Sequence, residues 1–484
     1  MSSTPAYRAG EGRVSAVRRA RVGHEVVEVD NGLVRLVIAP ALGGRVLSAV
    51  RDGREFLHRN PELLDDALGA RDPRTVGPHD GPMSAWRNWG GDKTWPAPQG
   101  WSGPGEWAGP PDAVLDSGAY ACEVDVADDG SRADITLTSG DDPRTGLRLT
   151  RRITLAAGRS DFSLRLGARN VSARKVRWAL WNVTQLPGHP AERPGDGAWL
   201  GTAGSGAPDT VDLVAGTGRP RVEHHGDLLH VPAQDVVGKV GFPDAAGWIA
   251  HVGLAGTWTY RFPVDPDAPY TDGGSRAEVW MEHPLDAPLG HLGGLRPRHR
   301  VVECEALGPY RELGPGDTTA LDGTVSLGPR LGAVTSVGEH AWWGEPLRYT
   351  AGKVTGVCVP SGGGRAAAGH GRPSAPAAAA RRVRGGFPLG TGRPVAGRAG
   401  CRTRRGVLRQ GRAGSGGGRR LTPGVHRCPA PRSILTIRGA GHRCTAVRPP
   451  WGGRRPSARR APPPGPGTRL RRAARARRVP PGPS

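Results

Sequence analysis

The chain has 484 residues and a formal net charge of +23, from 67 lysines and arginines against 44 aspartates and glutamates. Residues 351–484 hold 30 of the basic residues and none of the acidic ones, so residues 1–350 carry a net charge of −7. No run of 18 apolar residues occurs, and the basic N-terminus lacks the apolar segment of a signal peptide, which argues against a membrane span and against secretion. Two cysteines in residues 1–350, Cys122 and Cys304, lie in alternating stretches and are expected to be buried thiols. We therefore expect a cytoplasmic protein.

Residues 25–350 read as a series of short strands that follow an N-terminal arm at residues 1–24. Asp52-Gly53 and Asp128-Asp129-Gly130 each separate two alternating segments, as in β-hairpins. A short helix is expected only over Pro61–Leu68. Many short strands with few helices predict an all-β fold, an antiparallel sandwich. The expected strands are Leu33–Ala39, Arg45–Val50, Glu55–His58, Tyr120–Ala127, Ala133–Ser139, Leu147–Leu155, Phe162–Arg169, Val176–Gln185, Val236–Gly241, Trp248–Leu254, Thr257–Pro263, Ala277–His283, Val301–Ala306 and Thr319–Leu327.

The segment from Trp86 to Trp107 has an unusual composition, with five tryptophans in 22 residues out of 14 in the chain. Gly and Pro interrupt it repeatedly, which predicts a loop and excludes a helix or a central strand. Aromatic faces beside charged and amide groups suit a sugar, which offers C–H faces for stacking and hydroxyl groups for hydrogen bonds. The alternative is a loop pinned internally by Asp92, through Lys93 or through the backbone.

The basic tail, residues 351–484, is dense in Arg, Gly, Pro and Ala and has no acid to pair with its arginines. Such a composition cannot bury enough apolar surface to offset the entropy of ordering, which predicts disorder. Three explanations stay open: a polycation that binds nucleic acid, an inert tail, or a shifted reading frame in a GC-rich gene. The abrupt loss of every acidic residue favours the third.

Several segments resemble the galactose-mutarotase-like superfamily in the order in which they occur. Asn31–Pro40 with Gly43–Val46 resembles the opening of these proteins. Trp89–Gln99 is similar to the signature of the DUF4380 group within the superfamily, and Trp178–Gln185 to a second marker of that group. Val301–Pro309, followed by Leu313–Thr318, resembles a late strand and turn. The resemblance covers about residues 25–330, and it implies a β-supersandwich with a sugar-binding cleft.

For aldose mutarotation, a base must take the proton of the anomeric hydroxyl and an acid must protonate the ring oxygen. The resemblance implies that a late Glu is the base, and Glu303 is the leading candidate, with Glu278 as its substitute. Glu303 and Glu305 share a face of their strand, while Cys304 points to the core. Two carboxylates that face the same way can raise one another's pKa. The alternative is a solvated polar face.

The acid is less well defined, because no histidine lies in a motif that matches the mutarotase acid. His283, at the end of an expected strand, is the candidate. Lys93 or Asp92 could serve in its place, in a different kind of active site. Further histidines that stay open are His189, His224, His225, His230, His251 and His291.

Substrate-binding candidates are charged, amide and aromatic side chains near the expected cleft, although Gln185 could equally be a buried amide and Lys239 an exposed strand lysine. These candidates are Arg45, Arg87, Trp89, Asp92, Lys93, Trp95, Gln99, Gln185 and Lys239.

The sequence predicts neither a cofactor nor a metal. Nucleotide-binding motifs are absent, and His426-Arg-Cys428 and His442-Arg-Cys444 depart from zinc-finger spacing. We expect a carbohydrate-active protein whose partner is a small sugar and not a membrane, with an aldose epimerase as the simplest form. The alternatives are a non-catalytic carbohydrate-binding protein and, more weakly, nucleic-acid binding through the tail.

Overall fold

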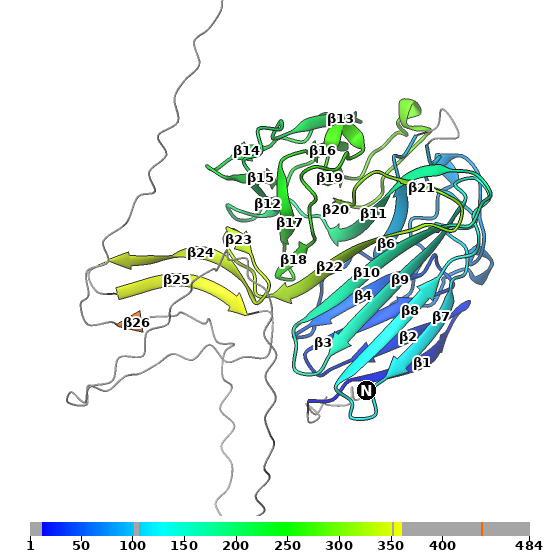
Figure 1. Ribbon diagram of the computed structural model, residues 1–484, viewed down its shortest axis with the longest axis horizontal. Helices are drawn as coiled ribbons and strands as arrows, with labels where there is room; N and C mark the ends of the chain where they lie inside the picture. Colours follow the sequence, from blue (N-terminus) through cyan, green and yellow to red (C-terminus); the bar gives the residue numbers. More distant parts are fainter. Residues whose placement is uncertain (1–11, 101–105, 351–352, 361–436, 439–484) are drawn as a thin grey trace, which may run out of the picture. The chain divides into compact units, whose positions relative to one another are not determined.

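The computed structural model describes residues 12–100, 106–350, 353–360 and 437–438, and almost all of its regular structure is β-strand (Figure 1). All strand pairs among these residues are antiparallel, as the sequence predicts, and most strands lie in two large sheets. The first sheet has the order β1 (Ser15–Arg21), β2 (His24–Asp30), β3 (Val34–Ala39), β4 (Arg45–Arg51), β6 (Asp92–Ala97), β11 (Val176–Pro187), β20 (Val301–Leu307), β19 (Ala277–Glu282), β16 (Gly238–Phe242) and β13 (Val211–Ala215), with β5 (Arg54–Glu55) on β4 and β21 (Arg311–Leu313) on β11.

The second sheet lies against the first, and Figure 1 shows β7–β10 as a layer over β1–β4. Its order is β14 (Glu223–His224), β15 (Leu228–Pro232), β12 (Gly197–Thr202), β17 (Ala245–Val252), β18 (Thr257–Arg261), β22 (Thr318–Gly328), β10 (Asp161–Asn170), β9 (Leu147–Ala156), β8 (Arg132–Thr138) and β7 (Ala121–Val126). The main hydrophobic core contains residues of both sheets.

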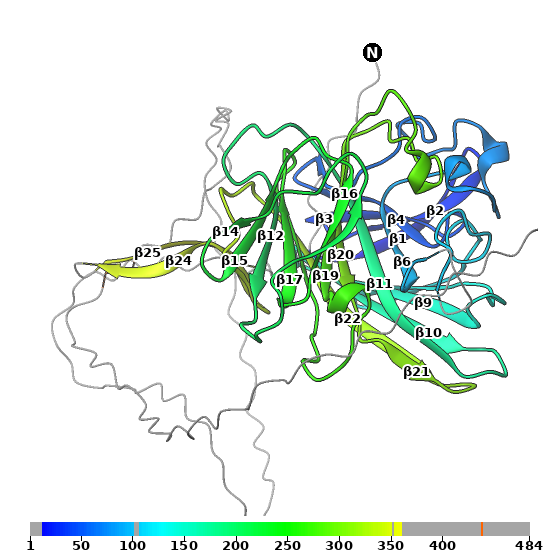
Figure 2. The same ribbon diagram turned by 90° about the horizontal axis from the view of Figure 1, so that it is seen from above.

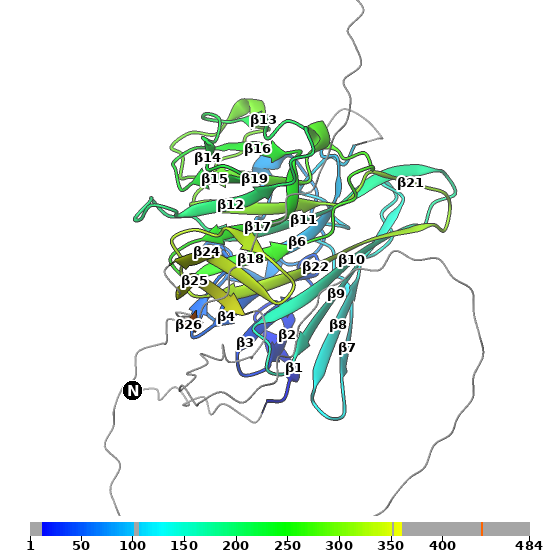
Figure 3. The same ribbon diagram turned by 60° about the vertical axis from the view of Figure 1, so that its left-hand side comes forward.

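A smaller sheet contains β23 (Ser336–Val337), β24 (Ala341–Thr350), β25 (Lys353–Pro360) and β26 (Ile437–Arg438). In Figure 3 the β24–β25 hairpin lies close to β17 and β18. Trp342 of β24 and Val359 of β25 are buried in one apolar cluster with Trp199 and Trp248. The boundary expected at residue 350 therefore falls inside this hairpin. The predicted disorder of the remaining tail concerns residues outside the described ones, apart from Ile437–Arg438.

The short helices among the described residues are single 3-10 turns: η1 (Pro73–Thr75), η2 (Met83–Ala85), η3 (Asp272–Gly274) and η4 (Gly290–Leu292). None of the described helices has the length and apolarity that a membrane crossing requires.

Burial differs between β9 of the second sheet and the central strands of the first sheet. Strand β9 of the second sheet alternates between buried and partly exposed residues, which is typical of a strand with one face on the core. By contrast, β6 and β20 are buried at every position, and β11 at all but two. In Figure 2 these central strands lie between β4 on one side and β19 and β16 on the other. Both faces of the sheet are thus covered at its centre.

One expectation about local structure is wrong. Pro61–Leu68 forms turns instead of a helix, because the Asp65 carboxylate accepts hydrogen bonds from the N–H groups of Ala67 and Gly69 and so offers the backbone an alternative to helix. The N-terminal arm contains β1, whose seven residues all pair with β2.

The Trp-rich segment is also not a simple loop, because its middle forms β6, a strand inside the first sheet. Strand β6 pairs with β4 only at Val46 and Asp92, whereas it pairs with β11 along its whole length. Pro96 lies beyond the pairing with β4, where β6 has a neighbour on one side only. A missing N–H is tolerated at such a position, which the composition of the segment could not reveal.

Gly91, the residue before β6, is expected to be essential for stability. It has φ +80°, and a Cβ there would lie 2.4 Å from the carbonyl oxygen of Val46. Gly91→Ala should lower the free energy of unfolding by about 2–4 kcal/mol, from backbone strain and this clash. Gly53→Ala is the control, since Gly53 has φ +71° and open space around it. Urea denaturation of both variants checks the difference, and equal losses would contradict the role of the close approach.

Candidate functional site

The outer face of the first sheet, which points away from the second sheet, carries a row of charged and amide side chains. Register defines it: Lys93 of β6 pairs with Val183, Val183 with Glu305, and Glu305 with Glu278. Two residues further along these strands, Gln185 pairs with Glu303, Glu303 with Trp280, and Trp280 with Lys239. Directly paired residues share a face of a sheet, as do residues i and i+2 of one strand. We call Lys93, Gln185, Lys239, Glu278, Glu303 and Glu305 the polar row.

Lys93 is the buried cation at one end of the polar row. Its Nζ lies 3.8 Å from Oε1 of Glu303, and 3.9 Å and 4.6 Å from the ring centroids of Trp95 and Trp86. Nζ has no hydrogen-bond partner among the described residues. Burial lowers the pKa of Lys93 to about 8, although the charge of Glu303 opposes the shift. The ammonium group is thus held by a carboxylate and two aromatic faces, with a free donor.

Glu303 has a second partner in Gln185, whose amide donates a hydrogen bond to the same oxygen, Oε1. Both side chains are buried, while Cys304 points to the core on the opposite face. The alternation predicted for Glu303, Cys304 and Glu305 is therefore confirmed. The alternative of a solvated polar face does not hold, because Glu303 is 7% exposed and Glu305 is fully buried.

Lys239 neutralises the other end of the polar row. Its Nζ lies 2.5 Å from Oε2 of Glu278 and 2.9 Å from Oε2 of Glu305, and 4.2 Å from the ring centroid of Trp181. Burial raises the pKa of Glu278 and of Glu305, against the charge of Lys239. Burial works against the charged form of Lys239, but the two carboxylates outweigh it and raise its pKa. Lys239 is thus the shared cation of two buried carboxyl groups.

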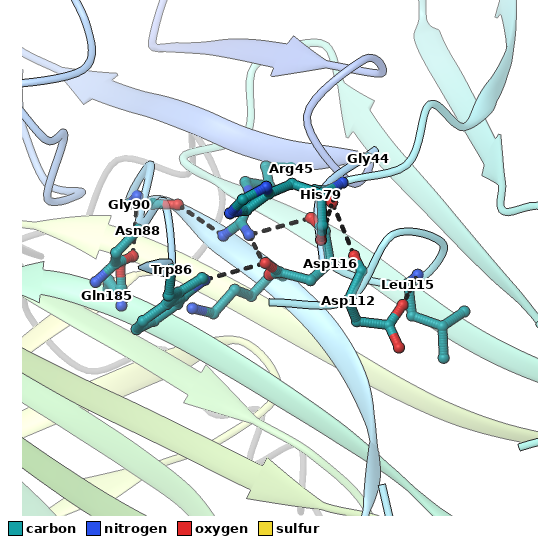
Figure 4. A network of polar contacts seen from close by, with 12 residues as sticks. Gly44, Arg45, His79, Trp86, Asn88, Gly90, Asp112, Leu115, Asp116 and Gln185 are labelled. Atoms are coloured by element: carbon teal, nitrogen blue, oxygen red, sulfur yellow. Dashed lines mark hydrogen bonds and ion pairs between the residues drawn. The ribbon is translucent and has the colours of Figure 1, made fainter. Parts of the chain in front are cut away.

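A second network, shown in Figure 4, holds Trp86, which lies over Lys93 Nζ. The guanidinium group of Arg45 is fully buried and forms an ion pair with Asp116, and it also donates a hydrogen bond to the carbonyl oxygen of Gly90. The other carboxylate oxygen of Asp116 accepts a hydrogen bond of 3.0 Å from the indole of Trp86. Arg45 therefore serves to fix Trp86 over Lys93, and no polar atom of its guanidinium group is exposed for a ligand.

Two further titratable groups lie beside the polar row. Burial, reinforced by the charge of Glu303, raises the pKa of Glu282 to about 7, and Trp280 donates a hydrogen bond of 2.9 Å to this carboxylate. Burial and the nearby His299 lower the pKa of His58 to about 4. The imidazole of His58 is thus neutral near neutral pH, and its ring centroid lies 5.6 Å from that of His299.

The polar row reaches solvent only in part. The side chains of Lys93, Glu303 and Lys239 are 2%, 10% and 13% exposed. Residues 283–300, between β19 and β20, extend to η2, where a Cβ on Gly293 would lie 3.0 Å from Cβ of Met83. A cavity of about 550 Å³ borders on both segments and on residues 108–114. Its lining includes neither Lys93 nor Glu303.

The structure brings some of the sequence candidates together and separates others. Lys93, Trp95, Gln185, Lys239, Glu278 and Glu303 share the outer face. Asp92 points to the opposite face, where it forms a buried ion pair with Arg151 and accepts hydrogen bonds from Asn182 and Thr184. Trp89 is buried in a separate apolar cluster.

Three other candidates make contacts outside the polar row. Arg87 donates a hydrogen bond to the carbonyl oxygen of Thr75. Gln99 forms an isolated bridge with Trp107. His283 lies just beyond the end of β19, close enough to Asp235 to lower the pKa of that carboxyl group, for which a hydrogen bond from Arg300 is the larger cause.

Sequence reasoning missed Glu282, His58 and Asp116, and it named Trp86 only as the first residue of the Trp-rich segment. The period of two that places Glu278 on the outer face also places Glu282 there, so Glu282 could have been found. His58 is the last residue of the expected strand Glu55–His58 but lies beyond β5, and Asp116 belongs to a connecting segment, so only the tertiary structure brings them to the site.

No family model and no curated protein matches the chain. Among solved structures, the chain is similar to a TPR-domain containing protein from Parabacteroides distasonis, with 16% identity, 63% of this chain and 47% of the other covered, and a TM-score of 0.40. The chain thus spans about half the length of that protein.

Two other similar structures are described as related to galactose mutarotase. A galactose mutarotase-like protein from Lactobacillus casei has 13% identity, with 63% of this chain and 100% of the other covered and a TM-score of 0.40. A galactose mutarotase related enzyme from Lactobacillus acidophilus has 11% identity, with 63% and 98% covered and a TM-score of 0.34.

Proposed function

We propose that the chain binds an aldose on the outer face of the first sheet and exchanges its anomers, with Glu303 as base and Lys93 as acid. The observation that carries the proposal is the distance of 3.8 Å between Lys93 Nζ and Glu303 Oε1 in a buried setting. The anomeric hydroxyl and the ring oxygen are bonded to the same carbon, so an acid and a base for this reaction must lie a few ångströms apart. The pKa of about 8 for Lys93 suits a proton donor near neutral pH.

In the proposed reaction, Glu303 takes the proton of the anomeric hydroxyl and Lys93 gives a proton to the ring oxygen. The bond between the anomeric carbon and the ring oxygen breaks, which leaves an open-chain aldehyde. After rotation about the adjacent carbon–carbon bond, Lys93 takes back the proton from the ring hydroxyl and Glu303 returns its proton to the new anomeric oxygen. The protein is unchanged at the end. Because the Lys93 side chain is 2% exposed, residues that cover it, Trp86 among them, have to move when the sugar enters.

Flat aromatic surfaces beside the two groups support a sugar as the ligand. Trp86 and Trp95 border Lys93, and Trp280 lies next to Glu303 in the register of the sheet. The side-chain amide oxygen of Gln185, Oε1, is buried and has no partner among the described residues. This oxygen could accept a hydrogen bond from a sugar hydroxyl.

A non-catalytic carbohydrate-binding protein is the second candidate. It is favoured by the near-complete pairing of the polar row, since Lys239 already neutralises Glu278 and Glu305, and Gln185 already donates to Glu303. Groups that are held in ion pairs and hydrogen bonds can orient a ligand without transferring protons.

Anomer exchange measured by saturation-transfer NMR, over a panel of hexoses and pentoses, tests the proposal. Lys93→Met and Glu303→Gln should each lower the exchange rate by about 10²–10⁴-fold, the contribution typical of general acids and bases. Both should retain binding of a methyl glycoside, which has no anomeric hydroxyl and cannot react. Lys175→Met is the control, because Lys175 is exposed and paired with Glu312. If the unmodified protein binds sugars but does not accelerate anomer exchange, the proposal is contradicted and the non-catalytic carbohydrate-binding protein is the remaining candidate.

The pH profile is a separate prediction. The donor must be protonated, and Lys93 loses its proton as the pH rises through about 8. The exchange rate should therefore fall above this pH and reach a plateau below it, until another group titrates. Rates from pH 6 to pH 10 check this, and a rate that rises through pH 8 would contradict Lys93 as the acid.

A further inference from the structure

We propose that Glu223, His225 and His230 form a binding site for a divalent transition metal of the zinc class, on the β14–β15 hairpin and apart from the polar row. The ligand atoms of these three side chains all lie within 4.8 Å of one another. Two imidazoles and one carboxylate are a donor set that suits zinc and its neighbours in the first transition row. Nothing in the proposed reaction uses these residues.

The hairpin itself brings the three side chains together. Glu223 of β14 pairs with His230 of β15, and the N–H of His225 donates to the carbonyl oxygen of Leu228 across the turn. Residues i and i+2 of a strand share a face, so Glu223 and His225 both lie beside His230. His224 pairs with Leu229 and points to the other face.

The hydrogen bonds of His230 indicate that a cation belongs at this position. Its Nε2 lies 3.0 Å from the carbonyl oxygen of Asp196, which can only accept, so Nε2 carries the hydrogen. Nδ1 then has a lone pair in the neutral ring, and it faces Oε2 of Glu223 at 3.1 Å. Two lone pairs at this distance repel unless a cation lies between them. A metal ion can be that cation, and so can a second proton on the ring.

The distances fit a metal. Two ligands at the usual zinc distances lie about 3.3 Å apart in tetrahedral geometry. The separation of 3.1 Å between His230 Nδ1 and Glu223 Oε2 is close to this value, as is the 3.5 Å between His225 Nε2 and the same oxygen. His225 has an exposed side chain that is free to adjust. Three protein ligands leave one tetrahedral position for water or a small ligand.

Two of the proposed ligands, His230 and Glu223, also have contacts that fix their orientation. The Asp196 carbonyl fixes His230, and Trp199 stacks on the same ring with a centroid distance of 4.2 Å and an interplanar angle of 13°. Arg221 forms an ion pair with the other carboxylate oxygen of Glu223. Such outer contacts orient ligands at metal sites.

Calorimetric titration of the full chain with ZnCl2, after treatment with a chelator, tests the site. We expect His225→Ala and His230→Gln each to weaken one zinc site by more than about 10-fold, while His224→Ala leaves it unchanged. His225→Ala keeps the test valid if His230→Gln misfolds, because the His225 side chain is exposed and its loss should not disturb the fold.

Titration with Co²⁺ separates this site from the tail, which contains cysteines as well as histidines. A site with two imidazoles and a carboxylate gives d–d absorption without a thiolate charge-transfer band. The proposal is overturned if the zinc stoichiometry and affinity are the same in His225→Ala and His230→Gln as in the unmodified protein. It is also overturned if no zinc binds. In either case a proton holds the contact between His230 and Glu223.

Discussion

Lys239→Met is expected to lower the free energy of unfolding by about 3–5 kcal/mol, because it leaves Glu278 and Glu305 buried without their cation. Methionine fills most of the space of the lysine stem and can still contact Trp181. The loss therefore reports the missing charge more than a cavity. Urea denaturation at pH 7, followed by tryptophan fluorescence, measures it.

The pH dependence of this loss of stability tests whether the buried carboxyl groups cause it. Burial raises the pKa of Glu278 and of Glu305 in the folded chain. A group with a raised pKa favours folding below its unfolded pKa, and this contribution is lost as the pH rises through the folded pKa. The deficit of Lys239→Met should therefore shrink as the pH falls towards 4. The double variant Lys239→Met with Glu278→Gln should recover part of the stability at pH 7. A deficit that is constant with pH would refute the electrostatic explanation.

Arg151→Met should have an effect of similar size, about 3–5 kcal/mol, because it removes a buried cation that ties the two sheets together. Arg151 projects from β9 of the second sheet, and its side chain is fully buried. It donates to the carbonyl oxygens of Gly44 and Asp92, at 2.7 Å and 2.8 Å, and forms an ion pair with the carboxylate of Asp92. The variant leaves three acceptors without this donor, one of them charged.

Arg152→Met is the matched control for this prediction. Arg152 is the next residue of the same strand, but its side chain is 51% exposed and pairs with Asp134. Asp134 is buried but keeps Arg132 as a second cation at 2.8 Å, so Arg152→Met should change the midpoint of denaturation only slightly. Equal losses in the two variants would mean that the link between the sheets has no special importance.

The alternation of apolar and polar residues allowed most of the strands to be predicted, because one face of each strand lies on the core. Leu147–Leu155 and Phe162–Arg169 correspond closely to β9 and β10. Strand β6 was missed because Pro and Gly normally break strands, and whether Pro96 is tolerated depends on which neighbours pair with it. Such pairing is a property of the sheet and not of the segment.

In the candidate site, too, some features could be predicted from the sequence and others could not. Because residues i and i+2 of a strand share a face, the sequence predicts that Glu303 and Glu305 lie together. The structure adds that both are buried. Asp92 and Lys93 are adjacent in sequence and were grouped as ligands, yet in a strand they point to opposite faces, so Asp92 serves the contact between the sheets.

By itself, the sequence determined the all-β antiparallel character of the chain and the face on which the late carboxylates lie, since both follow from periods of two residues. Only the tertiary structure decided which charges meet, because Lys93, Gln185, Lys239 and Glu303 come from four strands whose order in the sheet differs from their order in the chain. The burial that shifts the pKa of Lys93 likewise results from packing by distant residues, among them Trp86 and Trp95.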